Sequence, residues 1–218
     1  MDADRKSGMP HIVLLGDSIF DNGAYTRGGP DVITQLRGVL PTGWRATLGA
    51  VDGATTEDFG RQISTLPTDT THIVLSLGGN DALGHADLLD RRVRSSAEVL
   101  AELASAAERF ERRYRRAVKA VVARGVPVTV CTIYNGNFPD ADFQRLASTA
   151  LTVFNDAILR VAFEHGLTVI DLRLICNEPA DYANPIEPSS RGGAKMARTI
   201  ATMLDGDGAR HSARVIAR

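Results

Sequence analysis

Ser18 follows a short apolar run in the stretch HIVLLGDSIFDN, residues 11–22. The run is typical of a buried strand, so this serine is expected at the strand's carboxyl end. A serine in that place has two ordinary roles. It caps a following helix by accepting hydrogen bonds from free backbone N–H groups, or it acts as a nucleophile when a base takes its proton. The stretch alone leaves both roles open.

Two further polar clusters follow apolar runs. The first, VDGATTEDF, contains Gly53, which is either a plain turn glycine or a position where a backbone N–H approaches a ligand closely. The second, LGGNDALGH, places Asn80 behind two glycines, with its side-chain amide as a hydrogen-bond donor. Together with the N–H groups of Ser18 and Gly53, this amide would form an oxyanion hole, in which one donor is typically worth about 3 kcal/mol. The three clusters jointly indicate acyl-transfer chemistry.

These clusters meet only if the strands before them are parallel neighbours. Short apolar runs alternate with longer amphipathic patterns along the chain, which is typical of βα units around a mostly parallel sheet. Strands are expected at 11–16, 44–51, 72–77, 126–134 and 167–174. Helices are expected at 30–40, 55–66, 93–124, 142–164 and 192–204. Such a sheet gathers the residues that follow its strands at one edge, where α/β proteins build their sites.

The composition fits one α/β domain over residues 1–218, with a core at 10–205 and loosely attached termini. The 25 basic and 26 acidic residues give a net charge of -1, which offers no attraction for nucleic acid. The N-terminus lacks an apolar signal segment, and no apolar stretch is expected to span a membrane. Cys131 and Cys176 lie in apolar runs and are expected to be buried free thiols, which favours a cytoplasmic protein.

The blocks GDSIFDN, DGATTEDF and LGGNDALG, in this order and spacing, resemble the first three motifs of the SGNH hydrolases, the GDSL-type lipases and esterases. The resemblance covers essentially the whole chain. It implies a three-layer α/β/α sandwich with a flavodoxin-like sheet of five parallel strands in the order 2-1-3-4-5. It also implies that Ser18 is the nucleophile, that Gly53 and Asn80 complete the oxyanion hole, and that the substrate is a small acyl ester.

The end of the chain departs from the family pattern. The family closes with D-x-x-H-P, whose histidine is the base, whereas this chain reads DYANPIEPSSRGGAKMA and places Asn184 and Glu187 at those two positions. A carboxylate with a pKa near 4.3 is about two units less basic than imidazole, a deficit of about 3 kcal/mol for proton transfer. Burial or a neighbouring carboxylate would raise the pKa of Glu187. Asp181 and Glu178 are its acidic neighbours in sequence.

Three interpretations of the missing histidine stay open. In the first, Glu187 is the base for Ser18, directly or through a water. In the second, His85 enters the site from the rim that follows Asn80. In the third, the pocket binds an acyl or glycosyl ligand, or serves a partner protein, without turnover. The candidate supporting residues around these possibilities are Asp17, Asp181, Asn184 and His85.

No His or Cys cluster stands at the spacing of metal ligands. We therefore expect neither a metal nor an organic cofactor, and a small-molecule substrate rather than a nucleic acid or a membrane. Tyr134, Asn135 and Asn137 follow the fourth expected strand and would line the site, although an Asn-Gly turn explains them equally well. Arg191 and Lys195 would begin the last helix, either solvated or holding a carboxylate or phosphate.

Overall fold

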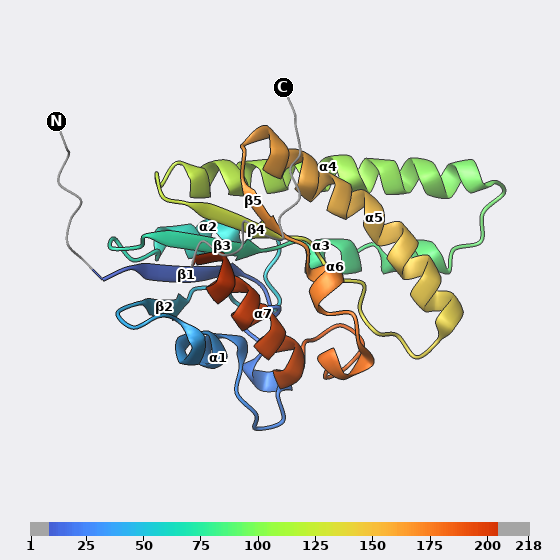
Figure 1. Ribbon diagram of the computed structural model, residues 1–218. Helices are drawn as coiled ribbons and strands as arrows, with labels where there is room; N and C mark the ends of the chain where they lie inside the picture. The colour runs from blue at the N-terminus through green and yellow to red at the C-terminus, as the bar shows by residue number, and fades with distance from the viewer. Residues whose placement is uncertain (1–8, 205–218) are drawn as a thin grey trace.

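The computed structural model describes residues 9–204, which build a β-sheet with helices on both faces (Figure 1). The sheet of the described residues has five strands: β1 (His11–Gly16), β2 (Arg45–Leu48), β3 (His72–Ser76), β4 (Val128–Cys131) and β5 (Thr168–Ile170). They stand in the order β2-β1-β3-β4-β5, and every pairing is parallel. The expected sheet is confirmed. The termini that we expect to be loosely attached, 1–8 and 205–218, lie outside the described residues.

Helices cover both faces of the sheet, which confirms the three-layer sandwich (Figure 1). One face carries α1 (Val32–Val39), α6 (Leu172–Ile175) and α7 (Ser190–Leu204). The other carries α2 (Phe59–Ser64), α4 (Ser96–Val122) and α5 (Ala141–Glu164). Short helical turns lie at α3 (Gly79–Leu83), η1 (Gly23–Tyr25), η2 (Ala86–Leu89) and η3 (Pro179–Asp181). Because successive side chains of a strand point to opposite faces, β1 contributes Val13 to one core and Leu14 to the other.

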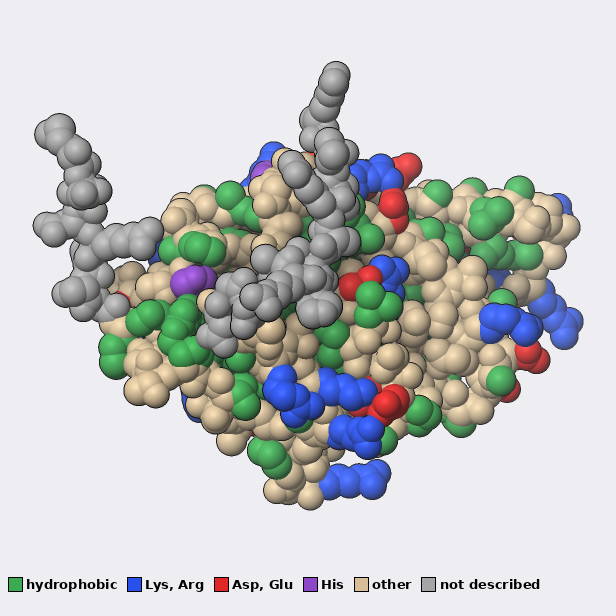
Figure 2. All heavy atoms as spheres, in the orientation of Figure 1, with side chains coloured by type: hydrophobic (Ala, Val, Ile, Leu, Met, Phe, Trp, Pro, Cys, Tyr) green, Lys and Arg blue, Asp and Glu red, His purple; other side chains and the backbone are tan. Residues whose placement is uncertain are grey.

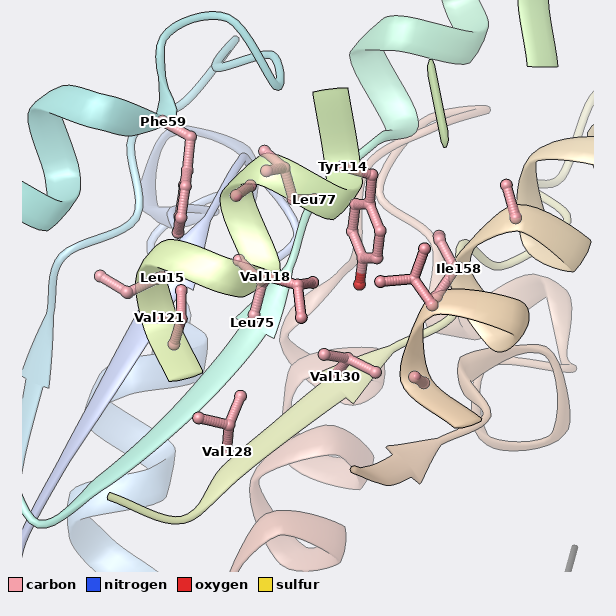
Figure 3. Close-up of a cluster of buried hydrophobic side chains, with 14 of the residues drawn as sticks. Leu15, Phe59, Leu75, Leu77, Tyr114, Val118, Val121, Val128, Val130 and Ile158 are labelled. Atoms are coloured by element: carbon pink, nitrogen blue, oxygen red, sulfur yellow. The ribbon is translucent and has the colours of Figure 1, made fainter. Parts of the chain in front are cut away.

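The core under α4 is built on a helical stripe. Tyr114, Val118 and Val121 recur at spacings of four and three, so they share one face of the helix. Figure 3 shows them turned toward Leu75 and Val130 of the sheet. On the other side of the sheet, Cys131 and Cys176 are buried and free, as the sequence predicts.

Several elements differ from the sequence expectation. β5 ends at Ile170 instead of reaching residue 174, because Asp171 caps α6 by accepting a hydrogen bond from the Arg173 N–H. The Thr132 hydroxyl donates to the same carboxylate at 2.8 Å and fixes this turn. β2 and β4 are likewise shorter than predicted. The short helix α3 has no signal in the apolar pattern and begins where Gly78 adopts a φ of 125°.

α5 is, by length and composition, apolar enough to cross a membrane, contrary to our expectation that no segment would be. In this fold the helix packs against α4 and β5. Its residues Phe154, Ile158 and Val161 are buried in the core beneath α4. About 33% of its most apolar stretch is buried inside the described structure.

Gln62 of α2 fixes the end of β1. Its buried amide donates to the Gly16 carbonyl at 2.7 Å and accepts from the Gly16 N–H at 2.8 Å. A Cβ atom at Gly16, where φ is 130°, would lie only 1.6 Å from the Ser76 carbonyl oxygen. Close contact with β3 on one side and the Gln62 amide on the other therefore hold the turn that leads to Ser18.

Replacing Gln62 with Leu is expected to lower the free energy of unfolding by about 1 to 3 kcal/mol, because the buried Gly16 N–H loses its partner while the Gly16 carbonyl keeps the Val51 N–H at 3.0 Å. Urea denaturation measures this. Arg61→Leu changes the exposed neighbour on the same helix and serves as the control. Equal stability of the two variants would contradict the role given to Gln62.

Candidate active site

Ser18 lies in a tight turn rather than at the start of a helix. The carbonyl of Asp17 accepts from the N–H groups of Phe20 and Asp21, both at 3.1 Å, and the chain then turns away. The next α-helix begins only at Val32, and its N-cap is Asp31. The capping role that the sequence left open for Ser18 is therefore wrong.

The Ser18 hydroxyl donates to Oε1 of Glu187 at 3.1 Å. The two residues stand 169 positions apart in the chain, and both are buried, at 7% and 6% exposure. Oε2 of Glu187 is buried and has no hydrogen-bond partner within residues 9–204. A proton acceptor thus lies within direct reach of the serine oxygen, with no water between them.

A compact turn presents Glu187 to Ser18. Oδ1 of Asn184 accepts from the N–H groups of Ile186 and Glu187, both at 2.9 Å. The turn is tied to two other loops: the Tyr134 hydroxyl donates to the Ile186 carbonyl at 2.6 Å, and the Asn22 amide donates to the Pro188 carbonyl at 3.1 Å. Asn184 therefore supports Glu187 through its backbone. Sequence reasoning did not identify Asn22, although its polarity within GDSIFDN was a signal.

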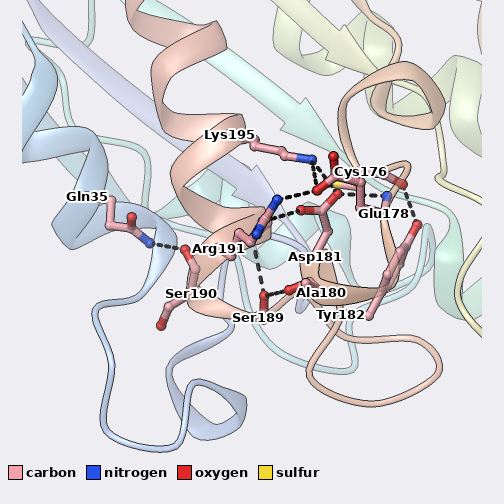
Figure 4. A network of polar contacts seen from close by, with 11 residues as sticks. Gln35, Cys176, Glu178, Ala180, Asp181, Tyr182, Ser189, Ser190, Arg191 and Lys195 are labelled. Atoms are coloured by element: carbon pink, nitrogen blue, oxygen red, sulfur yellow. Dashed lines mark hydrogen bonds and ion pairs between the residues drawn. The ribbon is translucent and has the colours of Figure 1, made fainter.

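Asp181 anchors this turn to α7 (Figure 4). Its fully buried carboxylate accepts from Lys195 Nζ at 2.7 Å and from the Glu178 N–H at 3.0 Å. Arg191 pairs with Glu178 and lies 3.7 Å from the Asp181 carboxylate. Figure 2 shows basic side chains gathered with acidic ones beside them over the lower part of this face, near α7. Arg191 and Lys195 thus hold carboxylates of this chain.

Burial raises the pKa of Glu187 to about 7. The hydrogen bond from Ser18 opposes this shift, and the negative charge of Asp52 adds to it. Asp181 and Glu178, the neighbours proposed from sequence, are instead engaged with Lys195. The negative charge that raises the pKa of Glu187 belongs to Asp52, in the loop after β2. In the sequence, Asp52 stands directly before Gly53.

Asp17 is a second buried carboxyl in the site. Its Oδ1 accepts from the Ile19 N–H at 3.2 Å, while Oδ2 has no partner among the described residues. Burial raises the pKa of Asp17 to about 7, and the charge of Glu187 contributes in the same direction. The site therefore holds two carboxyl groups that each disfavour ionisation of the other.

Of the expected oxyanion donors, Asn80 lines the same cavity as Ser18, whereas Gly53 is not among the residues that line it. Asn80 uses one amide N–H to donate to the Ala54 carbonyl at 3.0 Å, which fixes the amide. Its second N–H has no partner within the described residues and can donate to a ligand. Gly53 adopts a φ of 76° on an exposed loop. Within residues 9–204 we find no hydrogen bond from the N–H of Ser18 or Gly53. Asp81 stiffens this region by accepting from Thr56.

A cavity of about 220 Å³ opens beside these residues. Ser18, Asn80 and Glu187 line one part of it, and mostly apolar side chains of α3, η2, α4, α5 and the segment after β4 line the rest. His85 also lines it, with its ring stacked on Phe154 at 6.2 Å between centroids, but it makes no hydrogen bond to Ser18 or Glu187 in the described structure. Residues 9–204 contain no group of three His, Cys, Asp or Glu side chains arranged to hold a metal ion.

The sequence profile of the GDSL-like lipase/acylhydrolase family matches residues 14–194. The chain belongs to this family. The match spans all the segments that contribute to the site, from β1 to the beginning of α7. Glu187, which the motif order predicts at the family's histidine position, accepts the hydrogen bond from Ser18. None of the curated proteins matches the sequence.

Solved structures share the fold. The extracellular lipase from Streptomyces rimosus is 21% identical with a TM-score of 0.66, and the alignment covers 90% of this chain and 99% of that one. Phospholipase A1 from Streptomyces albidoflavus NA297 is 19% identical with a TM-score of 0.63, covering 91% and 99%. The lipase/acylhydrolase from Enterococcus faecalis is 18% identical with a TM-score of 0.63, covering 91% and 97%.

The raised pKa of Glu187 predicts a pH-dependent loss of stability. Between about pH 4.5 and 7 the folded chain retains a proton that the unfolded chain has released, so stability falls as the pH rises through this range. Glu187→Gln removes this effect while keeping an acceptor for Ser18. Relative to that of the variant, the free energy of unfolding of the wild type should fall by about 1 to 3 kcal/mol over this range, allowing for solvent screening.

Chemical denaturation at pH 4.5, 6, 7 and 8 measures the difference. Glu108→Gln, which changes an exposed glutamate on α4, is the matched control. A difference between wild type and Glu187→Gln that stays constant with pH would contradict a buried carboxyl with a raised pKa.

Proposed function

We propose that this family member is a serine esterase in which Glu187 replaces histidine as the base. The observation that supports it is the buried Ser18–Glu187 hydrogen bond of 3.1 Å. At a pKa of about 7, Glu187 is as basic as an ordinary imidazole, whose pKa is about 6.5. Burial thus removes the deficit of driving force that an ordinary carboxylate would have. The substrate class that follows is a carboxylic ester of a small molecule.

In the first half of the reaction, ionised Glu187 takes the proton of the Ser18 hydroxyl while Oγ attacks the ester carbonyl carbon. The negative charge on the carbonyl oxygen is held by the N–H groups of Ser18 and Gly53 and by the Asn80 amide. The intermediate then breaks its bond to the alcohol oxygen. Glu187 gives its proton to that oxygen, and the acyl group stays on Ser18.

In the second half, water attacks the acyl carbon of the Ser18 ester. Glu187 takes a proton from the water and returns it to the Ser18 oxygen as the bond to that oxygen breaks. A carboxylic acid leaves, and the free hydroxyl is restored.

The proposal predicts how variants lose activity on short-chain esters. Ser18→Ala should abolish turnover, and Glu187→Gln should lower kcat by about 10²- to 10⁴-fold because the general base is lost. Asn80→Ala should lower kcat by about 10²- to 10³-fold because one oxyanion donor is lost. Initial rates measured on purified variants check these values, with Ser64→Ala at an exposed serine as the control.

The pH profile distinguishes the candidate bases. Wild-type kcat/KM should fall about tenfold per pH unit below about pH 7, where Glu187 becomes protonated. The residual activity of Glu187→Gln should lack this acid limb, whereas His85→Ala should keep it. An acid limb that survives in Glu187→Gln belongs to another group and refutes Glu187 as the base. Asp52→Asn should shift the limb to lower pH, because it removes a negative charge near Glu187.

A further inference from the structure

The cavity at Ser18 extends well beyond the atoms that the proposed reaction needs. From the site it runs between the amino-terminal halves of α4 and α5, which diverge from the sheet in Figure 1. Val99 and Leu103 line it from α4, and Leu151 and Phe143 line it from α5. Most of this wall is apolar. Binding there removes a hydrocarbon group from water, which is favourable, whereas a sugar or a charged group would find few hydrogen-bond partners.

The volume of the cavity indicates whether it would hold an acetyl group or a longer acyl chain. A dry cavity of about 150 Å³ lined by apolar side chains is large enough to bind the six carbons of benzene. By the same proportion, 220 Å³ accommodates up to about nine carbons, so an acyl chain of about eight fits within it. An acetyl group would leave most of this space empty.

Two alanines on α5 keep the cavity open. Ala147 and Ala150 lie one turn apart and line its wall, where the neighbouring positions carry Phe143, Leu151 and Phe154. Because a helix rises about 1.5 Å per residue, Ala147 lies about 10 Å along α5 from Phe154. Phe154 is near the sheet end of the helix, since the adjacent Asn155 hydrogen-bonds the backbone of Ile133 just after β4. A bulky side chain at residue 147 or 150 would therefore close the far part of the cavity.

We propose that this cavity binds the acyl chain of the substrate, that the preferred chain is unbranched with about eight carbons, and that Ala147 and Ala150 set its length. The proposal rests on the proposed esterase function and names the acid half of its substrate. The acyl carbon lies at Ser18, and the chain runs between α4 and α5.

The experiment measures kcat/KM for p-nitrophenyl esters from C2 to C16. Wild-type kcat/KM should rise about fourfold per methylene, the equivalent of about 0.8 kcal/mol, to a maximum near C8. Ala147→Phe and Ala150→Phe should each move the maximum to C4 or shorter. Losing room for four methylenes should lower the C8 value by about two hundredfold. Each C8 value is expressed relative to the same variant's C2 value, which separates a loss of chain binding from a general loss of activity.

Thr149→Phe adds the same side chain to the exposed face of α5 and should leave the chain-length profile unchanged. A wild-type profile that is highest at C2, or a profile that neither alanine variant shortens, would overturn the acyl-chain site. Hydrolysis through Ser18 would then still stand.

Calorimetric titration with octanamide and acetamide tests the same site without turnover. The wild type should bind octanamide more tightly by about fourfold for each added methylene, and Ala147→Phe should abolish this preference. Octanamide binding without hydrolysis of any ester would refute the proposed function and support the chain site. Equal binding of both amides would overturn the chain site.

Discussion

The buried hydrogen bond between Ser18 and Glu187 is the interaction on which the rest of the site depends. A carboxylate is costly to bury, and the usual response is a raised pKa that makes the neutral form accessible near neutral pH. Here burial raises the pKa of Glu187 to about 7, which is the range of a useful base. The bond also requires that two distant segments be held together, because its partners are 169 residues apart. The Asn184 turn, the tie from Tyr134 and the Asp181–Lys195 ion pair supply that support.

The site carries features that cost stability. Asp17 and Glu187 each leave one buried oxygen without a partner in the described structure. Gly16 and Gly78 adopt positive φ values where a side chain would collide with Ser76 or Phe110. Such departures concentrate where chemistry requires them, and the rest of the fold must offset them. The two hydrophobic cores, one on each face of the sheet, stabilise the fold enough to offset this cost, and β1 and β4 are buried along their whole length.

One architectural element serves both stability and substrate binding. Near the sheet, α4 and α5 pack through Phe110 and Phe154, whose rings lie 5.4 Å apart between centroids. Farther along, the same two helices line the cavity through Val99 and Leu103 on one side and Ala147 on the other. The change from large to small side chains along α5 is what turns a helix interface into an open pocket. The length of the proposed acyl group follows from where that change occurs.

Apolar periodicity in the sequence determined the fold, because a parallel sheet with helices on both faces requires buried strands and amphipathic helices in alternation. The motif order likewise determined that Ser18, Gly53 and Asn80 follow successive strands. The sequence also predicts Glu187 at the family's histidine position, but it could not fix the pKa of that carboxyl. Only the tertiary structure decided this, since burial and the charge of Asp52 depend on loops brought together by folding. The same holds for Asp181, which stands near Glu187 in sequence yet binds Lys195. It holds equally for the cavity, whose space depends on how far two helices diverge.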